Sequence, residues 1–175
     1  MERTRNKYIQ DKLYIGIDNG VSGTIAVIYN NEVEFFLTPI KSEQNYTKKK
    51  GNISRVDFLL LDTLMKDMIR KYHPQSIFCL IERPMVNPGR FAATISALRA
   101  LEATLIVIER NGVPYQYLDS KEWQKILLPN GSKGEQLKKD SCDIGCRLFP
   151  QFTEEIRKHK DADGLLIAEY CRRYF

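Results

Sequence analysis

The fold is decided near the start of the chain by the stretch Leu13-Tyr-Ile-Gly-Ile-Asp-Asn-Gly-Val-Ser-Gly-Thr-Ile-Ala-Val-Ile28. Its apolar residues predict two strands, Lys12 to Asp18 and Ser22 to Tyr29, and the glycines between them permit a tight turn. Asp18 is then a carboxylate at the point where a buried strand enters that turn. Burying a charge is costly without compensation, so Asp18 is the first candidate site residue. The alternative is an Asp that only caps the turn.

The remaining segments predict a mixed order of strands and helices. Glu32 to Thr38 alternates as a third antiparallel strand, and residues 39 to 53 are polar and lysine-rich, which predicts a mobile loop. Apolar periodicity predicts the later elements. They are a helix from Ser54 to before Pro74, a strand Ser76 to Glu82, a helix Phe91 to Arg110, a strand Val113 to Leu118, and helices Lys121 to Leu127, Gly134 to Leu148 and Ala162 to Arg173.

This order describes an α/β fold of the RNase H-like type. We expect a five-stranded mixed sheet, with three antiparallel strands followed by two parallel ones and helices on both faces. Sugar-kinase and actin-like ATPases open with a similar strand and glycine turn, but 175 residues are too few for their two lobes. We therefore expect a single domain over residues 1 to 175, with a flexible start at residues 1 to 11.

Composition restricts the setting and the partners. The chain is 43% hydrophobic and 28% charged. We expect no membrane span and no signal peptide, and hence a cytoplasmic protein. Four scattered cysteines predict free thiols rather than disulfides or a zinc site. The net charge of +5 comes from clustered lysines and arginines, which favours nucleic acid as the partner and gives no indication of a small-molecule substrate. Solvated basic faces are the alternative.

A second carboxylate ends the strand Ser76 to Glu82. In the predicted topology this strand lies parallel to the first, so Asp18 and Glu82 leave the sheet at the same edge, where sites of α/β sheets gather. Two carboxylates in an apolar setting repel each other unless a cation lies between them. The sequence therefore predicts a divalent metal at this edge.

A third acidic cluster lies near the end of the chain. Asp163 opens the predicted last helix and would lie toward the same edge. His159 and Lys160 precede it by four and three residues, so either shares its face if the helix extends that far back. Asp161 is equally suited to capping the helix and to binding metal.

Several motifs in chain order resemble the RuvC-type four-way-junction (Holliday junction) resolvases, the phage-encoded branch most. They are the Gly-Ile-Asp-x-Gly-x-x-Gly opening at 16 to 23, Ile-Glu-Arg-Pro at 81 to 84, Trp-Gln-Lys at 123 to 125, the Gly-x-x-Leu-Lys-Lys stretch ending in Leu-Phe-Pro at 134 to 150, and Asp-Gly-Leu-Leu-Ile-Ala from 163.

The resemblance implies a metal-dependent endonuclease that nicks branched DNA symmetrically. Asp18, Glu82 and Asp163 would match the family's metal ligands. The family's fourth ligand usually stands where this chain has Lys160, so Asp161 or His159 would replace it, or the site works with three carboxylates and a nearby lysine. Two Mg²⁺ ions, or Mn²⁺ as a substitute, would promote phosphodiester hydrolysis, and His159 could orient the attacking water or be a surface residue.

The family also implies a twofold homodimer on a four-way DNA junction. The helix Phe91 to Arg110 could form the dimer interface or be buried within the monomer. The loop after Glu82 would enter the junction centre, where Met85 or Phe91 could wedge against bases, although a core position suits Phe91 better. The expected DNA-contacting residues are Lys48, Lys49, Lys50, Arg83, Met85, Arg90, Phe91, Lys133, Lys138, Lys139 and Lys160.

Two rival functions remain open on the sequence. One is a related nuclease that cuts RNA–DNA hybrids or flapped DNA. The other is a branched-DNA-binding protein that has lost catalysis. Sequence preference at the cut site is not readable, because phosphate contacts position DNA without specifying its sequence.

Overall fold

The protein, as a computed structural model, is described over residues 11 to 175. Its main sheet has five strands in the order β3-β2-β1-β6-β7. Strand β1 pairs antiparallel with β2 and parallel with β6, and β6 pairs parallel with β7, so the predicted mixed sheet is confirmed. The strands are β1 (Lys12–Ile17), β2 (Thr24–Tyr29), β3 (Glu32–Leu37), β6 (Ser76–Glu82) and β7 (Tyr115–Leu118).

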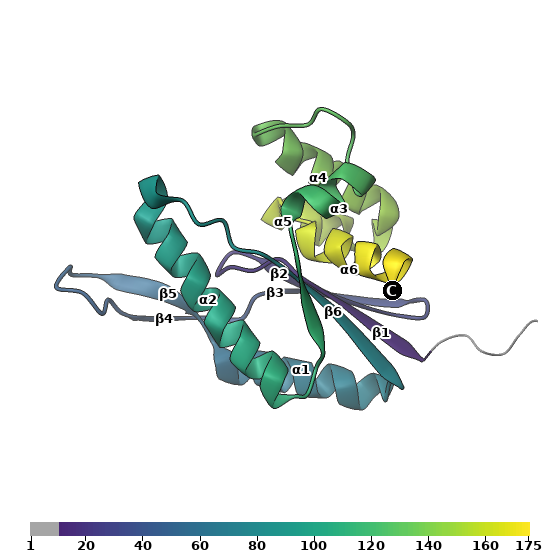
Figure 1. Cartoon of the computed structure of the whole chain (residues 1–175), viewed down its shortest axis with the longest axis horizontal. Helices are drawn as coiled ribbons and strands as arrows, with labels where there is room; N and C mark the ends of the chain where they lie inside the picture. The colour runs from purple at the N-terminus through teal and green to yellow at the C-terminus, as the bar shows by residue number, and fades with distance from the viewer. Residues whose placement is uncertain (1–10) are drawn as a thin grey trace, which may run out of the picture.

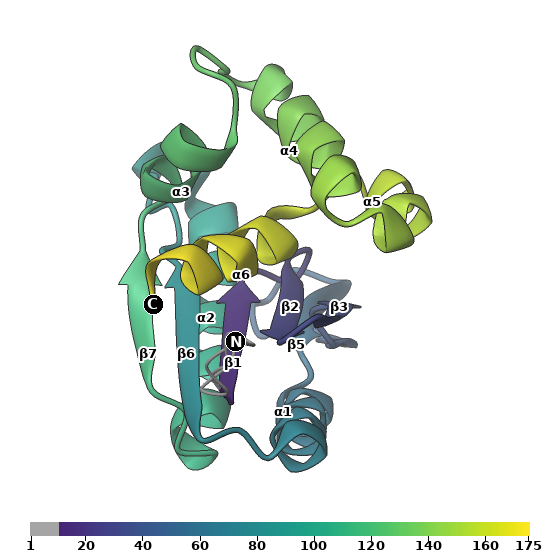
Figure 2. The same ribbon diagram turned by 90° about the vertical axis from the view of Figure 1, so that its right-hand side faces the viewer.

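Helices cover both faces of this sheet, as predicted (Figure 2). Helices α1 and α2 lie on one face, and α6 crosses the other (Figure 1). The alternation of β1 fits this arrangement, because Leu13 and Ile15 point into the core with α1 and α2 while Tyr14 points into the core with α6. The helices are α1 (Phe58–Tyr72), α2 (Phe91–Arg110), α3 (Ser120–Leu127), α4 (Glu135–Leu148), α5 (Thr153–His159) and α6 (Asp163–Tyr174), with short 3₁₀ turns at Pro88–Arg90 and Pro150–Phe152.

The pairing of β1 with β6 places the site. Ile17 is paired with Ile81, so the next residues, Asp18 and Glu82, leave the sheet side by side at its carboxyl edge. Glu82 is in turn paired with Leu118 of β7.

Residues 39 to 53, predicted as a mobile loop, form most of a β-hairpin instead. Strands β4 (Ile40–Gln44) and β5 (Asn52–Val56) pair antiparallel as a separate two-stranded sheet that projects beside α2 (Figure 1). Both strands are mostly polar, so they lack the apolar alternation that predicts a strand from sequence. Arg55 and Lys41 form ion pairs with Glu43 across and along the hairpin.

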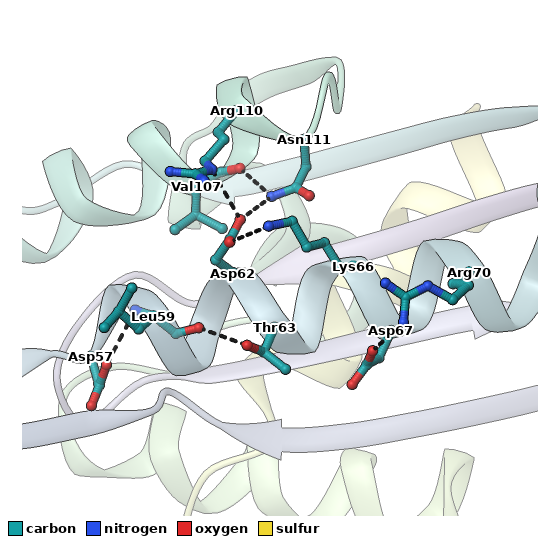
Figure 3. A network of polar contacts seen from close by, with 10 residues as sticks. All are labelled: Asp57, Leu59, Asp62, Thr63, Lys66, Asp67, Arg70, Val107, Arg110 and Asn111. Atoms are coloured by element: carbon teal, nitrogen blue, oxygen red, sulfur yellow. Dashed lines mark hydrogen bonds and ion pairs between the residues drawn. The ribbon is translucent and has the colours of Figure 1, made fainter.

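Helix α1 begins four residues later than predicted. Ser54 belongs to β5, and Asp57 is the N-cap, whose side chain accepts hydrogen bonds from the backbone of Leu59 and Leu60. Further along α1, Asp62 accepts hydrogen bonds from Lys66 Nζ (2.6 Å) and Asn111 Nδ2 (2.8 Å), which ties α1 to the end of α2 (Figure 3).

The sequence predicted no membrane span, and among the described residues one segment is long and apolar enough for one by length and composition alone. This segment is Pro88–Arg110, with a mean hydropathy of 1.7. In the fold, α2 is the crossover helix between β6 and β7 and packs against α1 and β5. Only 28% of its apolar window is buried, so much of its apolar surface stays open.

The predicted flexible start falls almost wholly on residues 1 to 10, which lie outside the described residues. Asp11 is described, and its backbone carbonyl accepts hydrogen bonds from the amides of Gln75 and Ser76. All four cysteines are free, in agreement with the prediction.

Candidate metal centre

Three carboxylates from distant parts of the chain meet at the carboxyl edge of the sheet. Asp18, Asp161 and Asp163 each bring one oxygen atom within 4.8 Å of the others. Asp18 follows β1, where its amide donates to the carbonyl of Thr24 (2.9 Å), and Asp163 is the first residue of α6. The cluster thus joins the end of a strand to the start of the helix that crosses it.

Glu82 lies beside this cluster rather than inside it. It ends β6 next to Asp18, and both residues line a hollow of about 230 Å³. One carboxylate oxygen, Oε2, accepts a hydrogen bond from the indole nitrogen of Trp123 at 2.7 Å. The negative charge of Glu82 is among the causes that raise the pKa of Asp18.

The pKa values of Asp18, Glu82 and Asp163 are raised because these acids are buried close together. Burial and then the charges of Asp161, Asp163 and Glu82 raise the pKa of Asp18 well above its ordinary value. Burial is also the main cause that raises the pKa of Glu82 to about 7 and that of Asp163 to about 6. The clustered acids therefore resist full ionisation at neutral pH unless positive charge is supplied.

In the described part of the chain, no protein cation supplies that charge directly. Among residues 11 to 175, none of the ion pairs involves Asp18, Glu82, Asp161 or Asp163. Lys138 acts only as a further influence, lowering the pKa of Asp163. Uncompensated carboxylates in a partly buried cluster are what a bound cation would stabilise.

Neutral side chains hold three of the acids in place. Thr24 Oγ1 donates to Asp161 Oδ1 at 3.0 Å, Ser141 Oγ donates to Asp163 Oδ1, and Trp123 donates to Glu82. Such donors fix the orientation of a carboxylate and leave its negative charge available.

The donor set fits hard divalent ions. Carboxylate oxygens are the ligands that Mg²⁺ and Mn²⁺ prefer, and Asp18, Asp161, Asp163 and Glu82 would hold them. A further oxygen is nearby in the chain: Asn19 Oδ1, next to Asp18, is buried and has no hydrogen-bond partner among the described residues. The site therefore contains more oxygen acceptors than its own donors satisfy.

Asp161 lies just before α6, whose N-cap position is Ala162 and has no side-chain cap. The Oδ1 atom of Asp161 accepts a hydrogen bond from the amide of Asp163, the first residue of α6, at 2.8 Å. The same residue belongs to the three-carboxylate cluster.

His159 does not share a helix with Asp163. Helix α5 ends at His159, and Lys160 then adopts a left-handed conformation with φ of 54°, which separates α5 from α6. The condition under which His159 or Lys160 would share the face of Asp163 is therefore not met. Both side chains are exposed.

Apart from Lys160, the predicted DNA-contacting residues occupy three exposed regions. Lys48, Lys49 and Lys50 lie at the end of the β4–β5 hairpin, and Lys133, Lys138 and Lys139 lie at or just before the start of α4. The third region is the segment that follows Glu82, where Arg83, Met85 and Arg90 line the same hollow as the acids.

Two of these residues have informative surroundings. Arg83 forms an ion pair with Asp119 (2.9 Å) and lies over the ring of Tyr117. The core position preferred for Phe91 is wrong, because its side chain is 71% exposed at the start of α2. It is exposed because the start of α2 extends beyond the edge of the main sheet (Figure 1).

Sequence reasoning missed the residues that orient the acids. Trp123 stood in a recognised motif, but its role was not assigned, and Thr24 and Ser141 are polar residues inside otherwise regular elements. Each is buried or nearly so, and a buried hydroxyl or indole needs a partner. That signal becomes specific only when the fold shows which acceptor is near.

Comparison with known proteins agrees with the architecture. No protein-family model and no curated protein sequence matches the chain. Among solved structures, RuvC of T. thermophilus in complex with a Holliday junction substrate has 15% identity and a TM-score of 0.53, with 89% of this chain and 90% of that chain covered.

Two further structures are similar at lower TM-scores. A Thermus thermophilus RuvC structure has 13% identity, covers 92% of this chain and 96% of its own, and has a TM-score of 0.48. The yeast mitochondrial Holliday junction resolvase Ydc2 has 18% identity, 95% and 86% coverage, and a TM-score of 0.44. At these identities the likeness concerns the fold, and the chain has the RNase H-like fold of RuvC-type resolvases.

Proposed function

We propose that this protein is a metal-dependent endonuclease that resolves four-way DNA junctions by paired symmetric nicks. The main support is the cluster of Asp18, Asp161 and Asp163 beside Glu82, which no protein cation neutralises among the described residues. The RuvC structure with the same fold is a complex with a Holliday junction substrate. A DNA substrate also suits the net charge of +5. The proposed place of action is the cytoplasm of a bacterial or phage-infected cell.

The proposed chemistry is hydrolysis of a phosphodiester bond. Two divalent ions, when bound, would supply a nucleophilic water at neutral pH and stabilise the charge on the leaving oxygen. The protein's part is to hold the oxygen ligands in one geometry, through the neutral donors Thr24, Ser141 and Trp123. We assign no part in this step to His159, which is exposed at the end of α5.

DNA binding is assigned to basic residues around the acidic cluster. Arg83 and Arg90 line the hollow shared with Asp18 and Glu82, and exposed Met85 stands on the same segment, suited to contact with unstacked bases. Lys138 is close enough to affect the pKa of Asp163, so a phosphate at the acids would also meet this cation. Phe91 and Lys160 are exposed and would extend this surface.

The β4–β5 hairpin would bind a more distant part of the DNA. Lys48, Lys49 and Lys50 lie beyond its paired strands. Near the same end, the guanidinium carbon of Arg99 in α2 lies 4.7 Å from the centre of the Tyr46 ring. This contact braces the hairpin against the helix. A braced arm with three exposed cations is suited to the phosphates of one duplex arm.

Two cuts on one junction require two active sites, and we propose a homodimer formed through α2. Exposed Leu98 and Ile106 lie two turns apart on this helix, and a largely apolar groove of about 400 Å³ runs between α2 and β5. A twofold contact uses the same patch on both copies, which suits a long helix with an open apolar face.

Cleavage assays on matched substrates test the function. The chain would be incubated with Mg²⁺ or Mn²⁺ and a four-way junction, a Y-shaped DNA, an RNA–DNA hybrid or a linear duplex. We expect paired nicks at symmetric positions in the junction, little cleavage of the duplex, and no cleavage by Asp18→Asn.

The other outcomes separate the rivals. Preferential cleavage of the hybrid or the Y-shaped DNA would show that the protein is a related nuclease and not a resolvase. Junction binding without metal-dependent cleavage would indicate a non-catalytic binding protein.

A further inference from the structure

Trp123 is the only tryptophan of the chain, and its side chain is completely buried. It belongs to α3 and lies in the core that this helix and α6 form with the sheet, among residues such as Leu118, Leu127 and Leu166. Its indole nitrogen donates a hydrogen bond of 2.7 Å to Glu82 Oε2, a residue 41 positions away. A buried residue of the core thus reaches directly to an acid at the candidate metal centre.

The surroundings of Trp123 are fixed from several directions. Helix α3 begins with a capping box formed by Asp119 and Glu122, and Glu82 is paired with Leu118 just before it. The amide of Arg83 donates to the carbonyl of Leu118 at 2.9 Å. The donor and the acceptor are therefore attached to two segments that are hydrogen-bonded to each other.

We propose that Trp123 is a positioning residue for metal binding, which holds Glu82 Oε2 and leaves Oε1 to face the ions. The inference rests on the proposed function, because it gives Glu82 a role as a metal ligand. Partners of this kind orient a ligand and tune its basicity, and their loss weakens metal binding by about 10–100-fold.

The chemistry of the donor supports positioning rather than neutralisation. An arginine or lysine in this place would compensate the charge of Glu82 and compete with a metal ion. The indole N–H is neutral, has a single direction and accepts no proton. It satisfies one oxygen and leaves the carboxylate anionic when a cation is present.

Packing alone does not require this arrangement. A buried core position is filled equally well by phenylalanine or leucine, which have no polar atom to satisfy. The indole nitrogen needs an acceptor, and the acceptor that the fold supplies is Glu82, not a backbone carbonyl. The specific partner is what distinguishes Trp123 from the other large core residues.

The single tryptophan allows a direct test on the unaltered chain. Mn²⁺ is paramagnetic and quenches nearby indole fluorescence, so we expect saturable quenching of Trp123 emission. Its midpoint should match Mn²⁺ binding measured by electron paramagnetic resonance of the free ion. Excess Mg²⁺ should reverse the quenching. Emission that stays constant while Mn²⁺ binds would overturn the inference.

The hydrogen bond itself is tested by Trp123→Phe, which keeps an aromatic ring and removes the donor. We expect the dissociation constant for Mn²⁺ to rise at least about tenfold. The matched control is Phe149→Leu, which alters a buried aromatic residue of the same core without a bond to Glu82. Its Mn²⁺ affinity should stay within about twofold, although its melting temperature falls.

The outcomes distinguish the two proposals. If Trp123→Phe binds Mn²⁺ as tightly as the unaltered chain, the positioning role is wrong and the nuclease proposal stands. If the unaltered chain binds no Mn²⁺ at the acids, both are wrong. If Trp123→Phe does not fold, judged by circular dichroism, the fluorescence experiment on the unaltered chain decides.

Discussion

Gly16 of β1 and Ala168 of α6 lie in direct backbone contact. A Cβ atom at position 16 would stand 2.8 Å from the Cα of Ala168, closer than real Cβ contacts, and closer still to its amide nitrogen. The same holds one turn earlier, where a Cβ at Gly164 would stand 2.7 Å from the carbonyl oxygen of Thr24. Glycines thus let α6 rest on β1 and β2. Because Asp163 begins α6, this approach also sets its distance from Asp18.

The first prediction is that Gly16→Ala displaces α6 and loosens the acidic cluster. The added methyl group meets backbone, which cannot turn aside, so we expect a loss of roughly 1–3 kcal/mol or more in the free energy of unfolding. Mn²⁺ affinity should fall as well. Denaturant unfolding and Mn²⁺ titration measure the two effects.

Gly20→Ala is the matched control for Gly16→Ala. Gly20 lies in the turn after β1, and a Cβ there would meet only atoms at 3.8 Å and beyond. We expect this variant to keep both stability and Mn²⁺ affinity. Equal stability of the two variants would refute the close approach of α6 to β1.

The position of Asp18 could be predicted because the signal is local and strong. An apolar strand that runs into a glycine turn has few other interpretations, and the end of β6 has the same form. Parallel pairing of those two strands then places Glu82 beside Asp18. Asp18 and Glu82 follow from such local patterns, and the order of strands and helices along the chain predicts the sheet order.

Sequence patterns are least informative where the structure depends on a specific interaction. The β4–β5 hairpin has polar strands held by pairing and by ion pairs to Glu43, so its periodicity resembles a loop. The spacing of His159 to Asp163 applies only within one helix, and the left-handed Lys160 interrupts it. The hydrogen bond of Trp123 joins residues 41 positions apart, and no local rule selects that partner.

The second prediction concerns the pH dependence of the metal-free protein. Folding raises the pKa of Glu82 from 4.5 to about 7 and that of Asp163 from 3.8 to about 6. An acid with a raised folded-state pKa contributes stability below its ordinary pKa, and this contribution is lost as the pH rises through the folded-state value. We therefore expect the melting temperature in EDTA to fall between about pH 5 and pH 8.

Mg²⁺ and a charge-removing variant provide the controls for this pH effect. Added Mg²⁺ should restore the melting temperature most strongly at the higher pH, since it binds the ionised acids. Asp18→Asn removes one of the repelling charges, so its metal-free form should be more stable than the unaltered chain at pH 8, while the proposed nuclease activity should be lost. A metal-free protein that gains stability from pH 5 to pH 8 would contradict the prediction.

The third prediction concerns Thr24, whose hydroxyl is buried between two partners. Its Oγ1 donates to Asp161 Oδ1 and accepts from the amide of Gly164, both at 3.0 Å. Thr24→Val keeps the shape and removes both hydrogen bonds, leaving a buried amide unsatisfied. We expect a loss of about 1–3 kcal/mol in the free energy of unfolding and weaker Mn²⁺ binding. Thr24→Ser retains the hydroxyl and should restore the metal affinity, and failure of that rescue would argue against the role of the hydroxyl.

The fourth prediction concerns the lysines of the hairpin. Replacing Lys48, Lys49 and Lys50 by glutamine should weaken junction binding, and the slope of its salt dependence should fall by about one for each phosphate that the hairpin no longer neutralises. The acidic cluster is untouched, so the proposed cleavage at saturating protein should persist. Arg70→Gln, on the exposed side of α1, removes a cation elsewhere and should leave the slope unchanged. An unaltered slope in the triple variant would show that the hairpin does not bind phosphate.

The fifth prediction concerns the dimer interface on α2. Leu98→Glu and Ile106→Glu place charges on its open apolar face, where the native side chains are 42% and 52% exposed. We expect the double variant to be a monomer of 20.3 kDa in light scattering, while the unaltered chain has twice that mass. Its junction cuts should become single and unpaired, because each monomer retains the acids.

The exposed apolar residues of α1 give the matched control for this interface. Leu59 and Leu60 are 61% and 57% exposed, and their replacement by glutamate changes charge to the same extent on a neighbouring surface. The dimer should survive these changes if α2 forms the interface. A charge buried between two copies costs far more free energy than the same charge left in water, so only changes at the interface should separate the dimer. If the α1 variant dissociates and the α2 variant stays dimeric, the interface lies on α1 and the prediction is wrong.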